Sequence, residues 1–179
     1  MRAFLALDIP ENTVAALTRL QTAIPFGRPV PEDNLHLTLA FLDDAPEAEL
    51  EDLHELLTGL RAAPVEIRFA GLDSFTETER GLIFVSVERT DALQALHDRL
   101  ASLCRSAGLD LPRRRFRPHV TLMRANRRPD GTARDRLAAS LGPRTDIPGF
   151  TAQAVTLYQS TLSSRGAVHD PLAVYPLRG

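Results

Sequence analysis

One short phrase occurs twice in the sequence: residues 36–39 read His-Leu-Thr-Leu and residues 119–122 read His-Val-Thr-Leu. Successive side chains of an extended strand point to opposite faces, so the histidine and the threonine of each copy share one face. The copies lie 83 residues apart (119 minus 36). Together they predict two strands that present an imidazole and a hydroxyl group to one cleft.

The residue types around the two motifs exclude several kinds of catalysis. Zinc takes three or four protein ligands, and neither motif places Asp, Glu or Cys beside its histidine on the same face, so no metal site and no cofactor are predicted. No nucleophile elbow and no glycine-rich phosphate loop occurs. All 21 basic residues are arginine, which rules out a lysine nucleophile or Schiff base.

Paired proton transfer on a phosphodiester is the chemistry that remains. An unperturbed histidine has a pKa of about 6.5, so one imidazole can accept a proton while the other donates one. The hydroxyl groups of Thr38 and Thr121 can donate hydrogen bonds to non-bridging phosphate oxygens. Spacing alone does not decide which histidine is the acid and which is the base.

The composition is that of a soluble globular protein, and we expect no targeting segment, because the apolar stretch at residues 1–12 is too short and its end too acidic for a signal peptide. The chain has 179 residues, which we expect to form a single domain (1–179). A net charge of −2 argues against bulk capture of nucleic acid, so an anion site has to be local. No apolar run is long enough to span a membrane, and the single Cys104 is expected to be a buried free thiol. We therefore expect a cytoplasmic monomer.

Alternating and helical patterns follow one another along the chain. Strands are predicted at 2–8, 35–42, 65–69, 81–87, 116–124, 150–162 and 167–176. Helices are predicted from Pro10 to Gln21, from Pro46 (at the first helical position) to Leu60, from the cap Thr90 to Gly108, and at 132–141. The proline-rich stretch 25–31 is predicted to be a loop or an irregular edge, 76–80 a loop, and 163–166 the turn of a hairpin.

A strand, a helix and a motif strand occur in this order in both halves of the chain. The pattern predicts an α+β fold of two similar lobes, each with a sheet rich in antiparallel strands. The two motif strands would face each other across a central groove, with the helices outside.

The motifs and their surroundings resemble the 2H phosphoesterase superfamily. The matching phrases are 34–42 (Asn-Leu-His-Leu-Thr-Leu-Ala-Phe-Leu) and 115–124 (Arg-Phe-Arg-Pro-His-Val-Thr-Leu-Met-Arg). Within the superfamily the chain is similar to the RNA 2′,3′-cyclic phosphodiesterases, also called 2′-5′ RNA ligase-like proteins. The similarity includes the opening strand 2–8, the lead-in 31–34 and the closing segment 157–166.

The resemblance implies a function and residue roles. It implies metal-independent hydrolysis of an RNA 2′,3′-cyclic phosphate end to a 2′-phosphate. In that family the first-motif histidine is the proton donor and the second is the proton acceptor, which gives these roles to His36 and His119. It also gives phosphate binding to Thr38 and Thr121.

Further candidates surround the motifs. Arginines cluster at 113–115, 117, 124, 127 and 128, which suggests a patch for phosphate or RNA backbone. Arg124 is the best phosphate candidate, although strict alternation would turn it away from His119 unless the strand bulges or ends there; Arg117 has the right parity instead. Phe41 could stack on a base. His169 is expected at the surface first and as a substrate contact second, and His54 and His97 are expected to be structural.

Three places depart from the family pattern, and three other functions stay open. Asp43 stands where the family often has glycine, Arg28-Pro29-Val30 replaces an aromatic lead-in, and His169 replaces a common aromatic residue. The enzyme could instead act on small cyclic nucleotide phosphates or join 2′-5′ RNA ends reversibly. A non-enzymatic RNA-end binding module is the third alternative, although arginine would hold phosphate better than histidine at neutral pH.

Overall fold

The computed structural model describes residues 1–75, 81–112, 115–125, 130–140, 146–164 and 166–179. Within these ranges the strands form two four-stranded antiparallel sheets and one two-stranded sheet. The first sheet has the order β10 (Gly166–Pro176), β9 (Ala154–Ser163), β1 (Arg2–Asp8), β3 (His36–Asp44). The second has the order β2 (Arg28–Pro29), β7 (His119–Arg124), β6 (Leu82–Val87), β5 (Phe69–Phe75). The third sheet pairs β4 (Val65–Ile67) with β8 (Phe150–Ala152).

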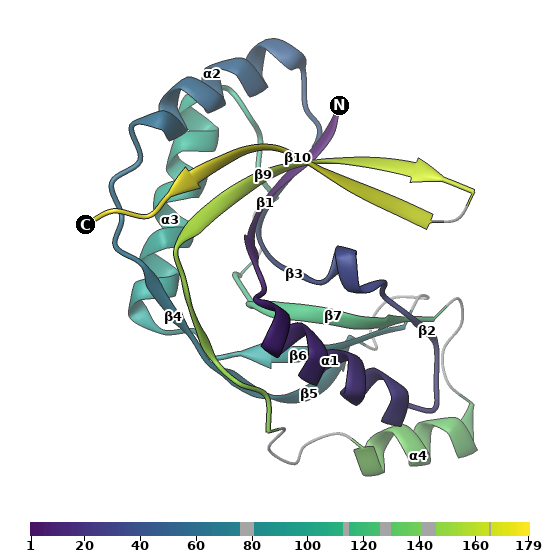
Figure 1. The fold of residues 1–179 in the computed structure, drawn as a ribbon. Helices are drawn as coiled ribbons and strands as arrows, with labels where there is room; N and C mark the ends of the chain where they lie inside the picture. Colours follow the sequence, from purple (N-terminus) through teal and green to yellow (C-terminus); the bar gives the residue numbers. More distant parts are fainter. Residues whose placement is uncertain (76–80, 113–114, 126–129, 141–145, 165) are drawn as a thin grey trace.

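The helices lie outside these sheets (Figure 1). They are α1 (Glu11–Ala23), α2 (Glu47–Thr58), α3 (Asp91–Ser106) and α4 (Gly131–Ser140), with a 3₁₀ turn η1 (Glu32–Asn34) before β3. In the chain, α1 lies between β1 and β3, and α3 lies between β6 and β7. Each motif strand pairs antiparallel with the strand that precedes its helix. The predicted α+β class with antiparallel sheets is confirmed, while the division into two duplicated lobes stays a prediction.

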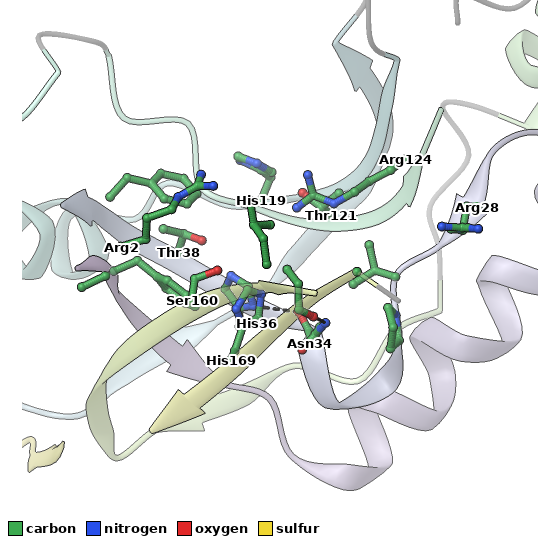
Figure 2. A pocket seen from close by; sticks show the side chains of 18 of the residues that line it. Arg2, Arg28, Asn34, His36, Thr38, His119, Thr121, Arg124, Ser160 and His169 are labelled. Atoms are coloured by element: carbon green, nitrogen blue, oxygen red, sulfur yellow. Dashed lines mark hydrogen bonds between the residues drawn. The ribbon is translucent and has the colours of Figure 1, made fainter. Parts of the chain in front are cut away.

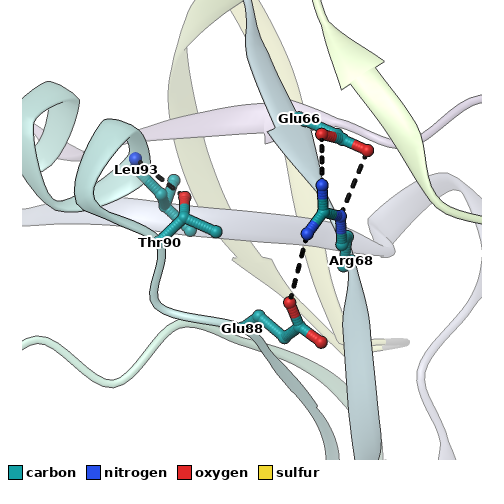
Figure 3. Close-up of polar contacts among 5 residues, drawn as sticks. All are labelled: Glu66, Arg68, Glu88, Thr90 and Leu93. Atoms are coloured by element: carbon teal, nitrogen blue, oxygen red, sulfur yellow. Dashed lines mark hydrogen bonds and ion pairs between the residues drawn. The ribbon is translucent and has the colours of Figure 1, made fainter.

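Local chemistry explains where α3 begins and ends. The Thr90 hydroxyl accepts a hydrogen bond from the Leu93 N–H at 3.2 Å, as the sequence predicts for a cap (Figure 3). Gly108 follows the helix with φ +86°, a backbone conformation that glycine adopts without strain and most other residues do not. Leu93, Leu96, Leu100 and Cys104 of the helix are buried, while Leu103 is half-buried. Burial raises the pKa of the Cys104 thiol to about 11.

Two predicted strands are each divided between sheets. The first part of the predicted strand 65–69 is β4, which ends at Ile67. After Arg68 the chain enters β5, which belongs to another sheet. Arg68 bonds Glu66 and lies 3.9 Å from Glu88 at this break (Figure 3). The predicted strand 150–162 breaks likewise between β8 and β9. A Cβ on Gly149 would lie 2.6 Å from the carbonyl oxygen of Ile67, so glycine permits the close approach there.

Other boundaries differ by a few residues. The second motif strand begins at His119 and not at residue 116, after Pro118, which has no N–H to donate. Pro46 is the residue directly before α2, which begins at Glu47, and is not the first helical residue. The short edge strand β2 fits the prediction of an irregular edge at 25–31. The predicted loop 76–80 and Leu141 lie outside the described residues. No helix in the described ranges is both long and apolar enough to cross a membrane.

Candidate active site

A groove of about 480 Å³ brings the two motifs together. His36 and Thr38 of β3 line it with His119 and Thr121 of β7, and Figure 2 shows these side chains around one space. Alternation along each strand explains why its histidine and threonine share a face. Both side chains are half-buried on the groove side, while Leu37 and Val120 between them are buried in the core. A volume of this size suits a small-molecule ligand.

Both imidazoles are fixed by the same type of hydrogen bond. Nδ1 of His36 lies 2.7 Å from the carbonyl oxygen of Asn34, and Nδ1 of His119 lies 2.7 Å from the carbonyl oxygen of Arg117. A carbonyl oxygen only accepts, so each Nδ1 carries the proton and donates it. In the neutral form of each ring, Nε2 is then the unprotonated nitrogen.

A phenylalanine supports each imidazole. The ring of Phe4 stacks on His36 with centroids 4.7 Å apart, and the ring of Phe84 packs on His119 at 5.0 Å. Burial lowers the pKa of His36 to about 4, against a smaller opposing effect of the hydrogen bond to Asn34. Burial also lowers the pKa of His119. Both imidazoles are therefore neutral at pH 7 in the unliganded protein.

A bulge in each motif strand turns one more side chain to the groove. Ile83 of β6 pairs with Met123 of β7, but the next residue, Phe84, pairs with Thr121. Leu122 is therefore left without a partner in β6. In β3 the same shift leaves Leu39 unpaired. The strands therefore lose strict alternation after the threonine, so the fifth residue after each histidine lines the groove.

These residues are Phe41 and Arg124. Phe41 is 55% exposed and lines the groove, so it does not belong to the core. Arg124 lines the groove as well, which is the outcome that the sequence made conditional on a bulge (Figure 2). Burial lowers the pKa of Arg124, and its charge contributes to lowering the pKa of His36. The same position thus carries an aromatic ring in one motif and a cation in the other.

Asp43, which stands where the family often has glycine, has a left-handed backbone. Its φ is +48°, the only positive φ of a residue other than glycine in the described ranges. Aspartate tolerates this conformation better than most residues, but glycine adopts it without strain. Asp43 also lines the groove, where it adds a negative charge.

His169 is not the surface residue that we expected first. It lies in the groove, half-buried, with its ring edge-on to His36 at 5.2 Å and 89°. Its position follows from β10, where it pairs with Ser160 of β9, another lining residue. Burial and the nearby charge of Arg124 lower the pKa of His169. The register of a hairpin whose residues are far from both motifs in sequence decides this placement.

Several lining residues were not predicted as site residues. Arg2, Arg28, Asn34 and Ser160 line the groove (Figure 2). Each lies in a segment that the sequence marks for other reasons: the opening strand, the irregular edge, the lead-in and the closing segment. Arg2 and Arg28 are each the only arginine of their segment, and they are the signal that could have indicated a cationic groove.

Other candidates lie elsewhere. Arg117 does not line the groove and forms an ion pair at 3.9 Å with Asp73. Arg115 is exposed beside α3, and the arginines at 113, 114, 127 and 128 lie outside the described residues. His54 bonds the Tyr175 hydroxyl at 2.8 Å, and His97 stacks on Phe116 at 4.0 Å, which fits structural roles. In the described part of the chain, no three His, Cys, Asp or Glu side chains are grouped as metal ligands.

Comparisons with known proteins identify the family of the chain. The family model described as the 2′-5′ RNA ligase superfamily matches residues 9–162. A Thermus thermophilus protein named RNA 2′,3′-cyclic phosphodiesterase is 32% identical, over 100% of this chain and 91% of its own length. A Geobacillus stearothermophilus protein of the same name is 28% identical over 98% of this chain; the aligned part is 57% of that protein.

Solved structures share the fold. A crystal structure from Thermus thermophilus superposes with a TM-score of 0.83 at 29% identity, covering 100% of this chain and 99% of that one. The structure of E. coli LigT superposes with a TM-score of 0.78 at 24% identity, covering 99% and 98%. The family match extends over both motifs and most of the chain. The chain belongs to the 2′-5′ RNA ligase superfamily.

Proposed function

We propose that the protein hydrolyses RNA 2′,3′-cyclic phosphate ends to 2′-phosphates, with His36 and His119 as the proton-transferring pair and no metal ion. One observation carries the proposal: both imidazoles donate Nδ1–H to a main-chain carbonyl and line one groove beside two threonine hydroxyls. The name RNA 2′,3′-cyclic phosphodiesterase of the relatives supports the same reaction.

The reaction needs one proton removed and one delivered. Water attacks phosphorus, and Nε2 of His119 takes the proton that the water loses. The bond between phosphorus and the 3′ oxygen breaks, and Nε2–H of His36 protonates that oxygen, which leaves a 2′-phosphate. The hydroxyls of Thr38 and Thr121 donate to the non-bridging oxygens, where negative charge grows.

His36 has to be protonated before it can act as the acid. Its pKa of about 4 in the free protein keeps it neutral at pH 7. A bound phosphodiester brings a negative charge next to the imidazole, and such a charge raises the pKa of a histidine. Binding of the substrate therefore favours the charged form of the donor, while the burial that lowers the pKa of free His36 also makes its proton readily transferable.

The residues at the two bulges would hold the rest of the substrate. We propose that Arg124 binds a phosphate oxygen and that the exposed ring of Phe41 stacks on a base. His169 lies against His36 and can contact the same nucleotide. RNA carrying the cyclic end is thus the proposed partner, and a cytoplasmic, monomeric, single-domain protein stays the prediction of the sequence.

The deciding experiment replaces each histidine by alanine and assays RNA that ends in a 2′,3′-cyclic phosphate. We expect His36→Ala and His119→Ala each to lower kcat by at least about a hundredfold, the usual contribution of a positioned acid or base. His97→Ala, outside the groove, should retain parental activity and serve as the control. Either groove variant working near the parental rate in a folded protein contradicts the proposal.

Further arms of the assay separate the other candidate functions. Activity that survives EDTA supports proton transfer without a metal ion, whereas its loss on chelation indicates a metal site. Faster turnover of a cyclic mononucleotide than of a cyclic-ended oligonucleotide favours a small-molecule substrate. Recovery of a 2′-5′ linked product from a 5′-hydroxyl strand indicates end joining. Tight binding of the cyclic-ended RNA without turnover indicates a binding module.

A further inference from the structure

Two arginines oppose each other where β2 joins β7. Arg28 and Arg124 are direct cross-strand partners, so their side chains leave the same face of the sheet, and both line the groove. Figure 2 shows Arg28 farther from the two histidines than Arg124. Like charges at directly opposed positions destabilise a sheet. Among the described residues, no carboxylate forms an ion pair with either guanidinium.

The backbone under this pair is built for a close junction. The carbonyl oxygen of Leu122, the bulged residue, accepts a hydrogen bond at 2.8 Å from the N–H of Val30. Gly27 has φ +90°, and a Cβ there would lie 3.1 Å from the carbonyl oxygen of Arg124. Glycine therefore permits both the turn into β2 and its approach to the end of β7.

A buried side chain of α1 ties the two strands together. Nε2 of Gln21 donates to the carbonyl oxygens of Val30 at 2.8 Å and Leu122 at 2.9 Å. Gln21 is only 7% exposed, and burying an amide is unfavourable unless it is hydrogen-bonded. Its two donors meet the main chain at the bulge that turns Arg124 toward the groove.

We propose that Arg28 and Arg124 form a subsite for an internucleotide phosphate of the bound RNA, and that Gln21 is its positioning residue. The inference rests on the proposed function, because the histidines and threonines take the terminal cyclic phosphate. A guanidinium group can donate two parallel hydrogen bonds to the oxygens of one phosphate. The negative charge of a phosphate between the two opposed arginines would also offset the repulsion between them. The subsite favours a strand with at least one phosphate besides the cyclic one.

The test compares two substrates: adenosine 2′,3′-cyclic phosphate, which has one phosphate, and a diadenylate with the same cyclic end, which has two. We expect Arg28→Gln to lower kcat/KM on the dinucleotide about tenfold, within the range for loss of a charged hydrogen bond, and on the mononucleotide by clearly less. Arg19→Gln removes a charge from the exposed side of α1 and should change neither. Equal effects on the two substrates overturn the subsite.

The role of Gln21 is tested by a double-mutant cycle with Arg124. We expect Gln21→Met to lower the preference for the dinucleotide, and to lower it no further once Arg124→Gln is present. Thr13→Val is the matched control, because buried Thr13 of the same helix also donates to a main-chain carbonyl, that of Pro148, away from the junction. Additive losses, or the same change of preference in the control, overturn the positioning role.

The outcome stays decisive if the reaction itself is different. Where the parent hydrolyses neither cyclic substrate, the proposed function fails, and binding of a short oligoadenylate without a cyclic end tests the subsite alone. Arg28→Gln should then lower the salt dependence of that binding by about 0.7 in the slope of log K against log salt, the value for one phosphate contact on a single strand. An unchanged slope overturns the subsite. If Gln21→Met fails to fold, the measurements on Arg28→Gln still test the subsite.

Discussion

Asn34 holds His36 through its main-chain carbonyl oxygen, 2.7 Å from Nδ1, while its own side chain is tied to a strand more than a hundred residues away. Nδ2 of Asn34 donates to the carbonyl oxygen of Ala167 in β10 at 2.7 Å. The same strand carries His169, whose ring meets His36 edge-on. The residue whose carbonyl oxygen orients His36 is thus anchored to a closing hairpin that contains neither motif.

Asn34→Ala should therefore lower kcat by about tenfold to a hundredfold, as small displacements of catalytic groups do, with little change in KM. The main-chain acceptor survives the substitution, but its anchor is lost, so the imidazole is held less firmly. Steady-state kinetics on a cyclic-ended RNA measures the effect. Thr58→Ala, which removes an exposed local hydrogen bond to Glu55, is the control. Parental kcat in the Asn34 variant would mean that the anchor is dispensable.

The pH dependence of kcat/KM should be bell-shaped with its maximum on the acid side of neutrality. One imidazole must be protonated and the other neutral, and burial lowers the pKa of both His36, to about 4, and His119. The rate then rises as pH increases past the lower of the two pKa values and falls past the higher. In kcat, bound phosphate raises both values, so the limbs should move to higher pH. A flat kcat/KM profile, or one centred above pH 7, contradicts the assignment.

His169 offers a variant that moves one limb of this profile. Its charge contributes to lowering the pKa of His36. His169→Phe keeps an aromatic ring against His36 but removes the charge, so the pKa of His36 should rise. The acid limb of kcat/KM is expected to shift to higher pH, with the other limb unchanged. A shift to lower pH would show that the charge of His169 does not act on His36.

Acid should destabilise the fold through His36. The pKa of His36 is about 4 in the folded chain and 6.5 in the unfolded chain. Between pH 4 and pH 6.5 the folded state therefore binds fewer protons than the unfolded state. The stability present above pH 6.5 is lost as pH falls toward 4, by at most about 3 kcal/mol for this shift. His36→Asn should lose less stability than the parent between pH 7 and 4, measured by urea unfolding. Equal losses in both proteins would exclude His36 as the cause.

Sequence reasoning predicted the position of the motif side chains better than that of the residues around them. Period-two alternation was sufficient to place His36 and Thr38 on one face, because no bulge intervenes between them. It could not place Phe41 or His169. Phe41 follows a bulge that depends on pairing with β1, and His169 reaches the groove through the register of β9 and β10. Alternation is a local property of the chain, whereas bulges and register depend on partner strands.

The divided strands have the same cause. Residues 65–69 and 150–162 have the apolar pattern of continuous strands, but each changes sheet where β4 pairs with β8. Nothing within either segment shows that the other will pair with it. Gln21 is the clearest case of this limit: it reads as one polar residue on a loosely amphipathic helix, and its two partners come from other elements.

Asp43→Gly should stabilise the protein. The left-handed φ of +48° costs an aspartate of order 1 kcal/mol that glycine does not incur, although glycine also has more freedom in the unfolded chain. We expect a gain of about 0.5 kcal/mol or less after these effects offset each other, read as a higher Tm. Asp44→Gly, which replaces the next strand residue, should be destabilising and is the control. A lower Tm for Asp43→Gly would show that its side chain makes a contact worth more than the backbone strain.

Phe41→Ala tests whether the exposed ring binds a base. A base stacked on an aromatic side chain contributes about 1–3 kcal/mol, so KM for a cyclic-ended RNA should rise by about fivefold to a hundredfold, with kcat nearly unchanged. The fold should tolerate the change, because the ring is 55% exposed. Val174→Ala removes a comparably exposed apolar group outside the groove and should leave KM at the parental value. Since an abasic cyclic ribose phosphate offers no ring to stack, its KM should be the same in the parent and in Phe41→Ala. If the variant weakens binding of the abasic compound as strongly, Phe41 shapes the groove and does not recognise the base.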